Sequence, residues 1–324
     1  MAYPDGCVFC EGALGSIEFH KEISMSESLP TRLRKLVAGS RCLVAPGAVD
    51  ALAARLIKLE GFEVVYMSGA GTTLTRIGMP DIGLLTMTEM VDNAARVVAG
   101  SELPVIADAD TGYGNALNVR RTIQHYERAG VAGVHLEDQM LPKRCGHFSG
   151  KVIVPVEEMK SKIKAAVDAR INPDFQVIAR TDALAVEGFA AALDRAAAYR
   201  ECGADMLFVE GMQSLEQIEE TGRRFKGVPL LFNSASSTTK TPHLSADELG
   251  PMGYRVSIFP NWMLLAAIPA MRRLLRELRS KGTGAALVKE LVSFEELNEI
   301  AGLQGAQELE ARYGLPDEQR ARIA

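Results

Sequence analysis

The sequence predicts a (β/α)8 barrel, in which eight parallel strands alternate with helices and close into a ring. Eight short apolar runs alternate with helical patterns along the chain, and polar residues follow most of the runs. The runs are apolar at nearly every position, which is typical of strands buried on both faces of a parallel sheet. An open doubly wound sheet is the alternative. It would fit fewer strands and a phosphate-binding glycine turn after the first one, whereas the residues from Pro46 to Asp50 read Pro-Gly-Ala-Val-Asp.

Each predicted strand is short and rich in β-branched or large aliphatic residues, the types that fit a pleated, buried surface. The eight runs in chain order are Cys42–Pro46, Glu63–Ser68, Pro104–Asp108, Gly133–Glu137, Gln176–Arg180, Met206–Glu210, Pro229–Asn233 and Tyr254–Ile258. Because helical patterns separate them, we expect neighbouring strands to be parallel and joined by helices on the outside of the barrel.

The predicted helices have Ala- and Leu-rich composition and apolar residues three and four positions apart. They span Val49–Glu60, Asn118–Ala129, Val156–Ala169, Gly188–Cys202, Ser214–Phe225 and Asp247–Met252. Several of these patterns end at a glycine just before the next strand, which is the residue expected after the last helical turn. These glycines are Gly61, Gly130, Gly203, Gly227 and Gly253.

Three regions follow from this pattern. Residues 1–30 have little regularity and are predicted to form an extension, residues 31–260 the barrel, and residues 261–324 a C-terminal helical region. The last region is predicted to contain helices at Trp262–Lys281 and Ala285–Leu297, followed by a charged tail. An apolar helical region beyond a closed barrel needs a cover, so we expect it to pack against a neighbouring subunit.

The composition narrows the class of partner. The 324 residues are 47% hydrophobic and 24% charged, with a formal net charge of −5. A mildly acidic chain argues against nucleic-acid binding, which needs a concentrated basic face. The sequence contains no run of 18 apolar residues, the length that would predict a membrane span, and its first residues do not resemble a secretory signal. We therefore expect a cytoplasmic protein with a small-molecule partner.

The cysteines give little support to a disulfide or zinc framework. Their number, five, is odd, and Cys7 and Cys10 form a C-x-x-C pair without a second pair or nearby histidines. Two thiols in an N-terminal tail are the simpler interpretation of that pair. Cys42 and Cys202 are interpreted as core thiols.

Polar and charged residues stand at the carboxyl ends of most of the predicted strands. They are Ser68-Gly69, Asp108 with Asp110, Glu137-Asp138, Arg180-Thr181-Asp182, Glu210 and Asn233-Ser234. In a barrel these ends converge on one mouth, where active sites lie. Strands that merely exit to solvent would explain one or two polar ends. They would not explain six acidic residues and an arginine on one rim, because clustered carboxylates repel one another unless cations or protons compensate.

The acidic residues predict a divalent metal site. Asp108, Asp110 and Glu137 supply hard oxygen ligands from adjacent strands, and Asp81 follows the second strand and adds another. Many carboxylates and few histidines favour Mg²⁺, with Mn²⁺ as an alternative, over zinc. For the D-x-D pattern alone, the alternative is a turn with helix-capping aspartates.

Arg180 is predicted to clamp a carboxylate of the substrate, because its planar guanidinium binds such groups with two hydrogen bonds. The alternative is an internal salt bridge to one of the neighbouring acids.

The connection after the fourth strand is unusually long and is predicted to form a lid. It contains Lys143-Arg144-Cys145-Gly146-His147 and a further glycine, Gly150. Neighbouring cations lower the pKa of a thiol, so Cys145 is a candidate proton donor or acceptor near neutral pH. An inert cysteine in a basic loop is the alternative.

Several of these segments together resemble the isocitrate lyase/phosphoenolpyruvate mutase superfamily. They are Lys-Arg-Cys-Gly-His at 143–147, Asp-Ala-Asp-Thr-Gly-Tyr-Gly at 108–114, Leu-Glu-Asp-Gln at 136–139, Ala-Arg-Thr-Asp-Ala at 179–183 and Tyr-Met-Ser-Gly at 66–69. The resemblance runs from about Arg32 to the helices near Gly282. The 143–147 segment looks like the carbon–carbon lyases, which include 2-methylisocitrate lyase, 2,3-dimethylmalate lyase and the oxaloacetate hydrolases. It is less similar to the phosphonate mutases, which lack that cysteine.

The resemblance implies a role for each site residue. Asp108 would bind Mg²⁺ directly, and the other metal-binding residues would hold it partly through water. The implied catalytic residues are Tyr66, Arg144, Cys145 and His147; the implied substrate-binding residues are Ser68, Gly69, Ala70, Gly146, Arg180, Glu210 and Asn233; and the implied metal-binding residues are Asp81, Asp108, Asp110 and Glu137. The resemblance also implies a C-terminal helix swapped between subunits and a homotetramer built as a dimer of dimers.

The expected reaction is Mg²⁺-dependent cleavage of a 2-hydroxy di- or tricarboxylate, through an enolate, to pyruvate and a second carboxylate. The sequence differs from methylisocitrate lyases after the seventh strand, where Asn233 to Pro242 reads Asn-Ser-Ala-Ser-Ser-Thr-Thr-Lys-Thr-Pro without their Glu and Phe, and at Ala70, where glycine is common. These differences make a malate-type substrate such as a dimethylmalate a contender. An oxaloacetate hydrolase or decarboxylase, and a non-catalytic barrel that binds an organic acid, are the alternatives.

Overall fold

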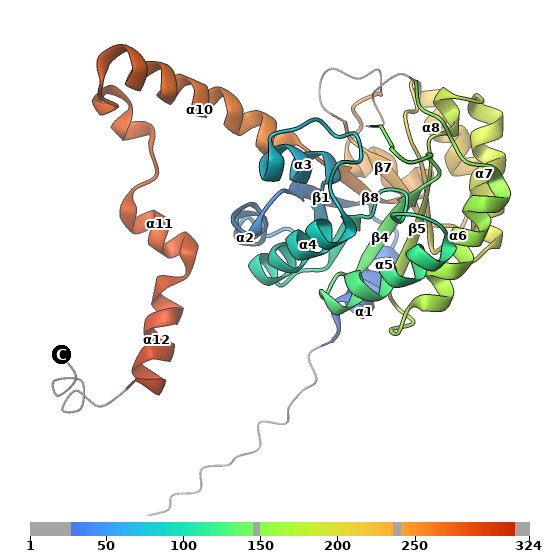
Figure 1. The fold of residues 1–324 in the computed structure, drawn as a ribbon, viewed down its shortest axis with the longest axis horizontal. Coiled ribbons are helices and arrows are strands. Elements are labelled where there is room, and N and C mark those ends of the chain that lie inside the picture. Colours follow the sequence, from blue (N-terminus) through green and yellow to red (C-terminus); the bar gives the residue numbers. More distant parts are fainter. Residues whose placement is uncertain (1–26, 145–149, 236–240, 315–324) are drawn as a thin grey trace, which may run out of the picture.

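The computed structural model describes residues 27–144, 150–235 and 241–314. Its centre is a closed barrel of parallel strands in the order β1 to β8, in which β8 pairs with β1 (Figure 1). Helices surround the barrel. The predicted (β/α)8 fold class is confirmed.

All eight predicted runs form strands. Their bounds are β1 Leu43–Ala48, β2 Val65–Met67, β3 Val105–Asp108, β4 Gly133–Glu137, β5 Gln176–Thr181, β6 Met206–Val209, β7 Leu230–Asn233 and β8 Tyr254–Phe259. The largest difference is in β2, which is three residues shorter than its predicted run.

Alternate residues of each strand point into the barrel or toward the helices. The inward residues, among them Tyr66, Ile106, Ile178 and Phe208, form one buried cluster, and the outward residues form a second cluster with the helices. Helix α1 (Leu29–Val37) contributes Leu33 and Val37 to the inner cluster and lies below the barrel in Figure 1, so it closes the end opposite the mouth.

The outer helices are α2 (Ala51–Leu59), α3 (Gly69–Ile77), α4 (Met87–Ser101), α5 (Ala116–Arg128), α6 (Val156–Ala169), α7 (Phe189–Glu201), α8 (Leu215–Arg224) and α9 (Ala246–Leu249). The predicted Asp247–Met252 helix is α9 followed by a 3₁₀ turn, η2 (Gly250–Met252), which contains a proline. A second 3₁₀ turn, η1 (Ala183–Ala185), follows β5. The five predicted helix-ending glycines all have φ between 80° and 100°, as a left-handed cap requires.

Besides α12 (Leu303–Tyr313) in the predicted tail, three helices of the barrel region were not predicted. Helix α1 spans the predicted boundary at residue 30, and α3 and α4 both lie between β2 and β3. Helix α3 has the sequence Gly-Ala-Gly-Thr-Thr-Leu-Thr-Arg-Ile, which is poor in strong helix formers. It forms because Ser68 caps its first turn and because Thr72 and Thr73 pack in the protein interior.

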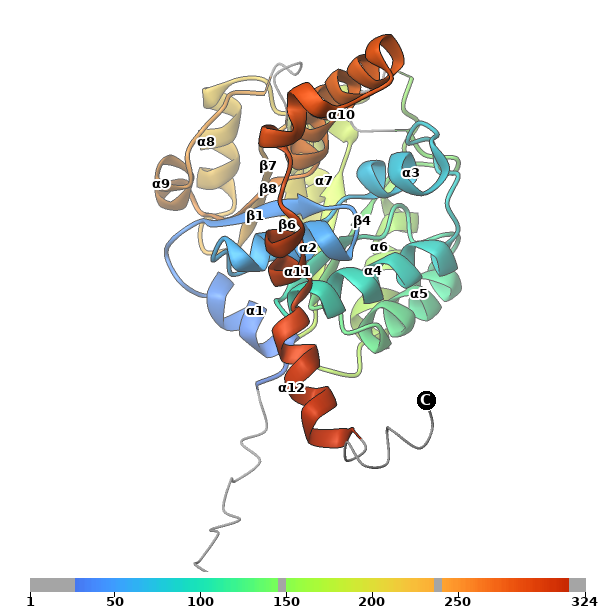
Figure 2. The same ribbon diagram turned by 90° about the vertical axis from the view of Figure 1, so that its left-hand side faces the viewer.

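Residues 262–313 form an arm that leaves the barrel after β8 (Figures 1 and 2). It consists of α10 (Trp262–Lys281), the 3₁₀ segment η3 (Ala285–Glu290), α11 (Phe294–Ala301) and α12 (Leu303–Tyr313). The first predicted helix is confirmed at both ends. The predicted Ala285–Leu297 helix is wrong, because Ser293 caps a new helix three residues after η3 ends.

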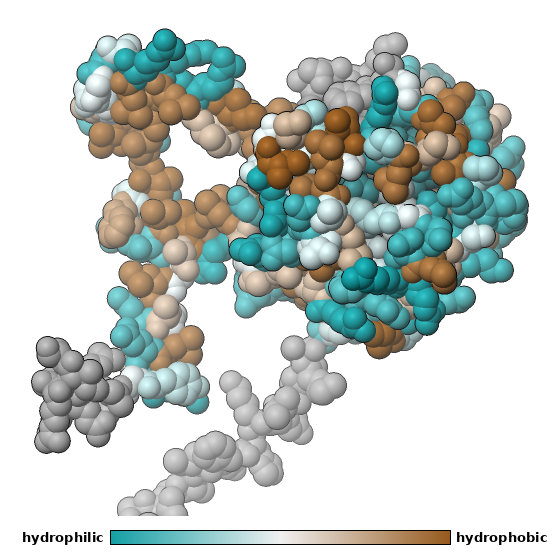
Figure 3. Space-filling view, viewed as in Figure 1, coloured by the Kyte–Doolittle hydropathy of each residue, from teal (hydrophilic) through white to brown (hydrophobic). Residues whose placement is uncertain are grey.

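The arm is apolar but uncovered within the described part of the chain. None of its helical residues is buried, and hydrophobic side chains lie along it in Figure 3. Although α10 has 20 residues, neither it nor another helix in the described ranges is both long and apolar enough to cross a membrane.

Candidate active site

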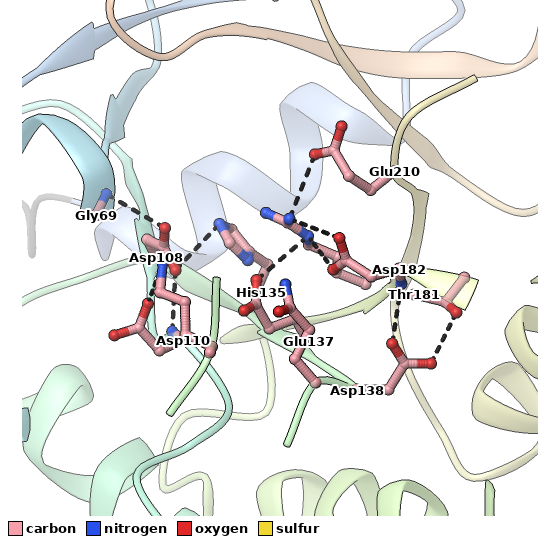
Figure 4. A network of polar contacts seen from close by, with 12 residues as sticks. Gly69, Asp108, Asp110, His135, Glu137, Asp138, Thr181, Asp182 and Glu210 are labelled. Carbon is pink, nitrogen blue, oxygen red and sulfur yellow. Dashed lines mark hydrogen bonds and ion pairs between the residues drawn. The ribbon is translucent and has the colours of Figure 1, made fainter. Parts of the chain in front are cut away.

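The predicted site residues of five strands meet at the carboxyl end of the barrel. Strand register places Asp108 beside His135, and Glu137 beside Arg180. Glu210 directly follows β6, and Asn233 ends β7. Figure 4 shows Asp108, Glu137 and Glu210 in one polar network around the axis of the barrel. The predicted convergence of these side chains is confirmed.

Asp108 is seated at the start of α3. Its carboxylate accepts hydrogen bonds from the backbone N–H of Gly69, at 3.2 Å, and of Asp110, at 2.9 Å. A Cβ at position 69 would lie 2.4 Å from the carboxylate, so only glycine allows this approach. The N-terminal end of a helix also favours a negative charge. Gly69, predicted to bind substrate, therefore has a clear second role in holding Asp108.

The charge of Asp108 is further stabilised from within the barrel. Burial opposes ionisation, but the imidazole of His135 and the cations of Lys143 and Arg180 hold the pKa of Asp108 below its usual value. The hydroxyl of Tyr126 donates to the carbonyl of Asp108 at 2.8 Å and fixes the end of β3. Asp108 is therefore a charged carboxylate at the mouth of the barrel.

Lys143 lies between two of the predicted metal-binding residues. Its Nζ is 2.5 Å from Oδ1 of Asp81 and 2.9 Å from Oδ1 of Asp110, and the side chain is buried. The sequence analysis named Lys143 only as a neighbour of Cys145. Burial of Asp110, together with repulsion by Asp108 and Asp81, raises its pKa to about 6 even though Lys143 opposes the shift. The buried cation thus offsets part of an excess of negative charge.

Glu137 keeps one carboxylate oxygen without a partner. Its Oε1 is buried and has no hydrogen bond within the described residues. Its pKa is raised well above the usual value, because burial and the charges of Asp182 and Asp108 outweigh the attraction of Arg180 and Lys143. A buried carboxylate of this kind is stabilised when a further cation binds.

The residues at the mouth suit a divalent cation that keeps part of its water shell better than a cation coordinated by protein ligands alone. Across the described ranges, no three His, Cys, Asp or Glu side chains converge closely enough to hold one ion. Mg²⁺ usually takes one or two carboxylates and retains several waters. Asp108 and Glu137, with Asp81 and Asp110 nearby, supply the hard oxygen donors for such an ion, so the chemistry of the donor set fits Mg²⁺ held largely through water.

Arg180 is tied to Asp182. Its Nε and Nη2 donate to the two carboxylate oxygens of Asp182 at 2.9 and 3.1 Å, and its guanidinium lies 5.2 Å from the centre of the Phe208 ring. Glu137 and Glu210 lie 3.3 and 3.6 Å away. The internal salt bridge that was the alternative for Arg180 therefore exists, and the side chain also lies at the mouth where a clamp is expected.

Glu210 and Asn233 form a pair on the far side of Arg180. The amide Nδ2 of Asn233 donates to Glu210 Oε2 at 3.1 Å. The backbone N–H of Glu210 donates to the carbonyl of Thr181 at 3.0 Å, which fixes the end of β6 against β5. The two predicted substrate-binding residues are thus in contact and beside the arginine.

Tyr66 faces His135, a residue that the sequence analysis missed. The two form a 2.9 Å hydrogen bond between Tyr66 Oη and His135 Nε2, and the same nitrogen is 3.6 Å from Asp108 Oδ1. Burial lowers the pKa of His135 to about 4, although Asp108 opposes the shift, so the imidazole is neutral near pH 7. The available signal was its place two residues before Glu137 in β4, which puts both on the inner face.

Ser68 and Ala70 lie around the first turn of α3. The hydroxyl of Ser68 caps this helix and donates to Oδ1 of Asn261 at 2.9 Å. Ala70 lines an apolar pocket of about 180 Å³ between α3 and the start of α10, where Asp81 also lies. Among the described residues, both side chains are thus placed by α3 and α10 at the edge of the mouth.

Four predicted residues belong to the connection after β4. The side chain of Arg144 is exposed, and its backbone N–H and carbonyl pair with the side chain of Gln139, both at 2.9 Å. Cys145, Gly146 and His147 lie outside the described residues, so their roles remain predictions.

Comparison with known proteins identifies relatives of the whole barrel. Residues 33–279 match the family described as phosphoenolpyruvate phosphomutase. A 2,3-dimethylmalate lyase of Eubacterium barkeri is 45% identical over 282 residues, which cover 87% of this chain and 97% of that protein. A 2-methylisocitrate lyase of Aeropyrum pernix is 41% identical over 279 residues, which cover 86% of this chain and 89% of that protein.

A solved structure agrees with the barrel and its surroundings. Oxaloacetate acetylhydrolase in complex with the inhibitor 3,3-difluorooxalacetate superimposes with a TM-score of 0.85 and 40% sequence identity. The match covers 90% of this chain and 98% of that one, so the likeness extends beyond the barrel strands to most of the molecule.

Proposed function

Because the chain belongs to the phosphoenolpyruvate mutase/isocitrate lyase superfamily and is a carbon–carbon lyase, we propose that it cleaves a 2-hydroxy di- or tricarboxylate into pyruvate and a second carboxylate. The observation that carries this proposal is the meeting of Asp108, Glu137 and Arg180 at the barrel mouth. One edge of this group suits a cation, and the other suits the carboxylate of an α-keto acid.

Mg²⁺, when bound, would polarise the oxygens of the α-hydroxy acid and stabilise the negative charge that develops on them. Asp108 would hold the ion directly, and Asp81, Asp110 and Glu137 would hold it partly through water. Two observations support this assignment: Oε1 of Glu137 is buried without a hydrogen bond among the described residues, and burial together with repulsion by Asp108 and Asp81 raises the pKa of Asp110.

Arg180 would bind the carboxylate of the pyruvate half. Its guanidinium is already oriented by Asp182, so little conformational entropy is lost when a substrate binds. Glu210 and Asn233, on the other side of Arg180, would bind the second fragment. The proton that this fragment needs would come from the thiol of Cys145, the role that the sequence resemblance implies for this residue.

Tyr66 would keep its proton throughout. Burial and the charge of Asp108 raise the pKa of its hydroxyl well above the usual value. A neutral hydroxyl beside Asp108 and His135 can donate a hydrogen bond to the oxygen of the α-hydroxy group, on which negative charge develops as the bond breaks.

Two substrates have specific support. The relative with 45% identity is named for 2,3-dimethylmalate, and the Ser/Thr-rich sequence after Asn233 lacks the Glu and Phe of methylisocitrate lyases, so we place a dimethylmalate-type acid first and 2-methylisocitrate second. Hydrolysis of oxaloacetate is the second candidate reaction, supported by the superposition on oxaloacetate acetylhydrolase. We also propose that the protein acts in the cytoplasm as a homotetramer.

The direct test is a panel of acids incubated with Mg²⁺, in which 2,3-dimethylmalate, 2-methylisocitrate and oxaloacetate are assayed for pyruvate release and isocitrate is assayed for glyoxylate release. We expect one hydroxy acid to release pyruvate and exhaustive chelation to stop the reaction. Activity that survives chelation would contradict the metal-dependent mechanism. Acetate and oxalate from oxaloacetate, without pyruvate from any hydroxy acid, would favour the hydrolase.

Cys145→Ser separates the classes of function further. A lyase should lose turnover while it still binds an α-keto acid, because only protonation of the second fragment is removed. A decarboxylase should lose less, and a barrel that only binds acids should be unaffected.

A further inference from the structure

Asp182 is a buried residue at the mouth to which the proposed mechanism assigns no chemical step. It follows β5, is 0% exposed, and contacts two cations that come from different parts of the chain. Arg180 binds both of its carboxylate oxygens, at 2.9 and 3.1 Å, and Nζ of Lys151 lies 2.8 Å from Oδ1. Burial opposes ionisation of Asp182, but these two cations hold its pKa below the usual value.

We propose that Asp182 is the positioning residue that aims the guanidinium of Arg180 at the substrate carboxylate, and that Lys151 completes this device. The inference rests on the proposed function, in which Arg180 binds the α-keto acid half. It concerns a pair of residues for which the sequence resemblance implies no role.

The first argument is competition for the guanidinium. Glu137 and Glu210 lie 3.3 and 3.6 Å from Arg180, one on each neighbouring strand. A long arginine side chain without a fixed partner would pair with either acid and would leave the orientation that a substrate needs. The two parallel hydrogen bonds to Asp182 fix the plane of the guanidinium, which a single contact cannot do.

The second argument is that Asp182 itself is held rigidly. Its backbone N–H donates to Oδ1 of Asp138 at 2.9 Å. The other oxygen of Asp138 accepts hydrogen bonds from Thr181 Oγ1 at 2.7 Å and Tyr199 Oη at 2.8 Å. Asp138, Thr181 and Tyr199 are fully buried, so the network behind Asp182 has little freedom to relax. Figure 4 shows the contacts of Asp138 with Thr181 and Asp182.

The third argument is charge. An isolated Arg180–Asp182 pair would be neutral and would attract an anionic substrate weakly. With Lys151, whose side chain is 3% exposed, the three groups carry one net positive charge beside Glu137 and Glu210. Lys151 thus allows Asp182 to orient the arginine without cancelling its attraction for a carboxylate.

The test uses oxalate, a planar dianion similar in size and outline to pyruvate, titrated into the Mg²⁺-loaded protein by calorimetry. We expect Asp182→Asn to raise the Kd for oxalate by about 10–100-fold, the usual effect of losing a residue that supports a ligand-binding group. For the substrate found in the acid panel, KM should rise by more than kcat falls.

A double-mutant cycle distinguishes positioning from general damage to the site. If Asp182 acts through Arg180, Asp182→Asn should change the Kd by less than about twofold when it is added to Arg180→Lys. Independent effects that multiply would overturn the inference. The matched control is Asp205→Asn, because Asp205 pairs with Arg170 at the opposite end of β5, and we expect its Kd for oxalate to equal that of the wild type.

A second variant keeps the test decisive if Asp182→Asn does not fold. Lys151→Met should raise the Kd for oxalate by about tenfold, the effect of losing one hydrogen bond to a charged group. If Lys151→Met or folded Asp182→Asn bound oxalate as tightly as the wild type does, this inference would be overturned, while the proposed function would stand. If the wild-type protein neither binds oxalate more tightly than Arg180→Lys nor cleaves any acid of the panel, the proposed function fails with it.

Discussion

Single residues at the mouth are arranged to balance buried charge. Lys143 lies between Asp81 and Asp110, and Arg180 is held by Asp182. Burying an unpaired charge costs several kcal/mol, so each of these carboxylates requires a cation or a proton nearby. Among the described residues, Oε1 of Glu137 is buried without a hydrogen bond, which is where the proposed metal ion would add a compensating positive charge.

The assignment of Asp108 predicts the effect of its removal. Asp108→Asn should weaken Mg²⁺ binding by more than about 100-fold, because losing a direct ligand should cost at least as much as losing a residue that only supports one. Calorimetric titration of the metal-free protein with Mg²⁺ measures this. The control is Asp92→Asn, because Asp92 pairs with Arg76 and Arg96 on the exterior of the protein. If Asp108→Asn bound Mg²⁺ as tightly as the wild type does, the proposed metal site would be contradicted.

His135 predicts a pH dependence of stability. Its pKa is lowered from 6.5 to about 4, so between these values the unfolded chain binds more protons than the folded one. The free energy of unfolding should therefore fall as the pH drops from 6.5 toward 4, by about 3 kcal/mol in total from this residue.

Urea unfolding of the wild type and of His135→Gln, at pH 7 and pH 4.5, measures that contribution. The wild type should lose more stability than the variant over this interval, because glutamine does not titrate. His125→Gln, at a partly exposed position on α5, is the control and should follow the wild type. Parallel pH profiles for the wild type and His135→Gln would contradict the prediction.

At the scale of elements, close helix packing outweighs local preference. Helix α4 lies against α2 with Gly100 at the contact, where a Cβ would come within 2.5 Å of the carbonyl oxygen and 3.0 Å of Cα of Ala51. Glycine is otherwise unfavourable inside a helix. Its presence here shows that the approach of two backbones is worth more than helix propensity at this position.

Gly100→Ala should therefore destabilise the protein, although alanine is the better helix former. The gain in propensity is up to about 1 kcal/mol, whereas overpacking against backbone atoms costs about 1–3 kcal/mol. Urea unfolding should show a lower free energy of unfolding than in the wild type. Gly305→Ala in α12, where no atom lies within 4 Å of the new Cβ, should leave stability unchanged or slightly higher. A Gly100→Ala variant as stable as the wild type would contradict the packing argument.

At the scale of the whole molecule, a large apolar surface on the arm is without a cover among the described residues. Met271, Leu275 and Leu278 repeat along one face of α10 and are 54%, 63% and 42% exposed, and Phe294 at the start of α11 is 80% exposed. An apolar helix face of this kind marks an interface between proteins. Among the described residues, α11 comes back beside α2 and α4, where Arg55 donates to the carbonyl of Ile300, but these exposed apolar side chains remain available to a second copy of the chain.

Leu275→Glu should accordingly reduce the assembly. We expect the wild type to have the mass of a dimer or tetramer by light scattering after gel filtration, and the variant to have a smaller mass at the same concentration. Leu117→Glu is the matched control, because Leu117 is 76% exposed but isolated on α5. A monomeric wild type, or a variant of unchanged mass, would contradict the interface.

The sequence alone determined the barrel and the polar ends of its strands. Both are properties of short segments, because a buried parallel strand must be apolar on both faces and its carboxyl end must reach the mouth. The sequence therefore predicts that Asp108, Glu137, Arg180, Glu210 and Asn233 lie together. The motif resemblance added roles for Tyr66 and the 143–147 segment.

Only the tertiary structure decided which charges pair. Lys143 meets Asp81 across 62 positions of sequence, and Lys151 meets Asp182 across 31, because loops of the barrel fold over the mouth in a way that no local pattern encodes. His135 was hidden for a similar reason: its burial against Tyr66 depends on strand register. The course of the arm was also decided by tertiary structure, since a helical pattern fixes which residues share a face but not what that face packs against.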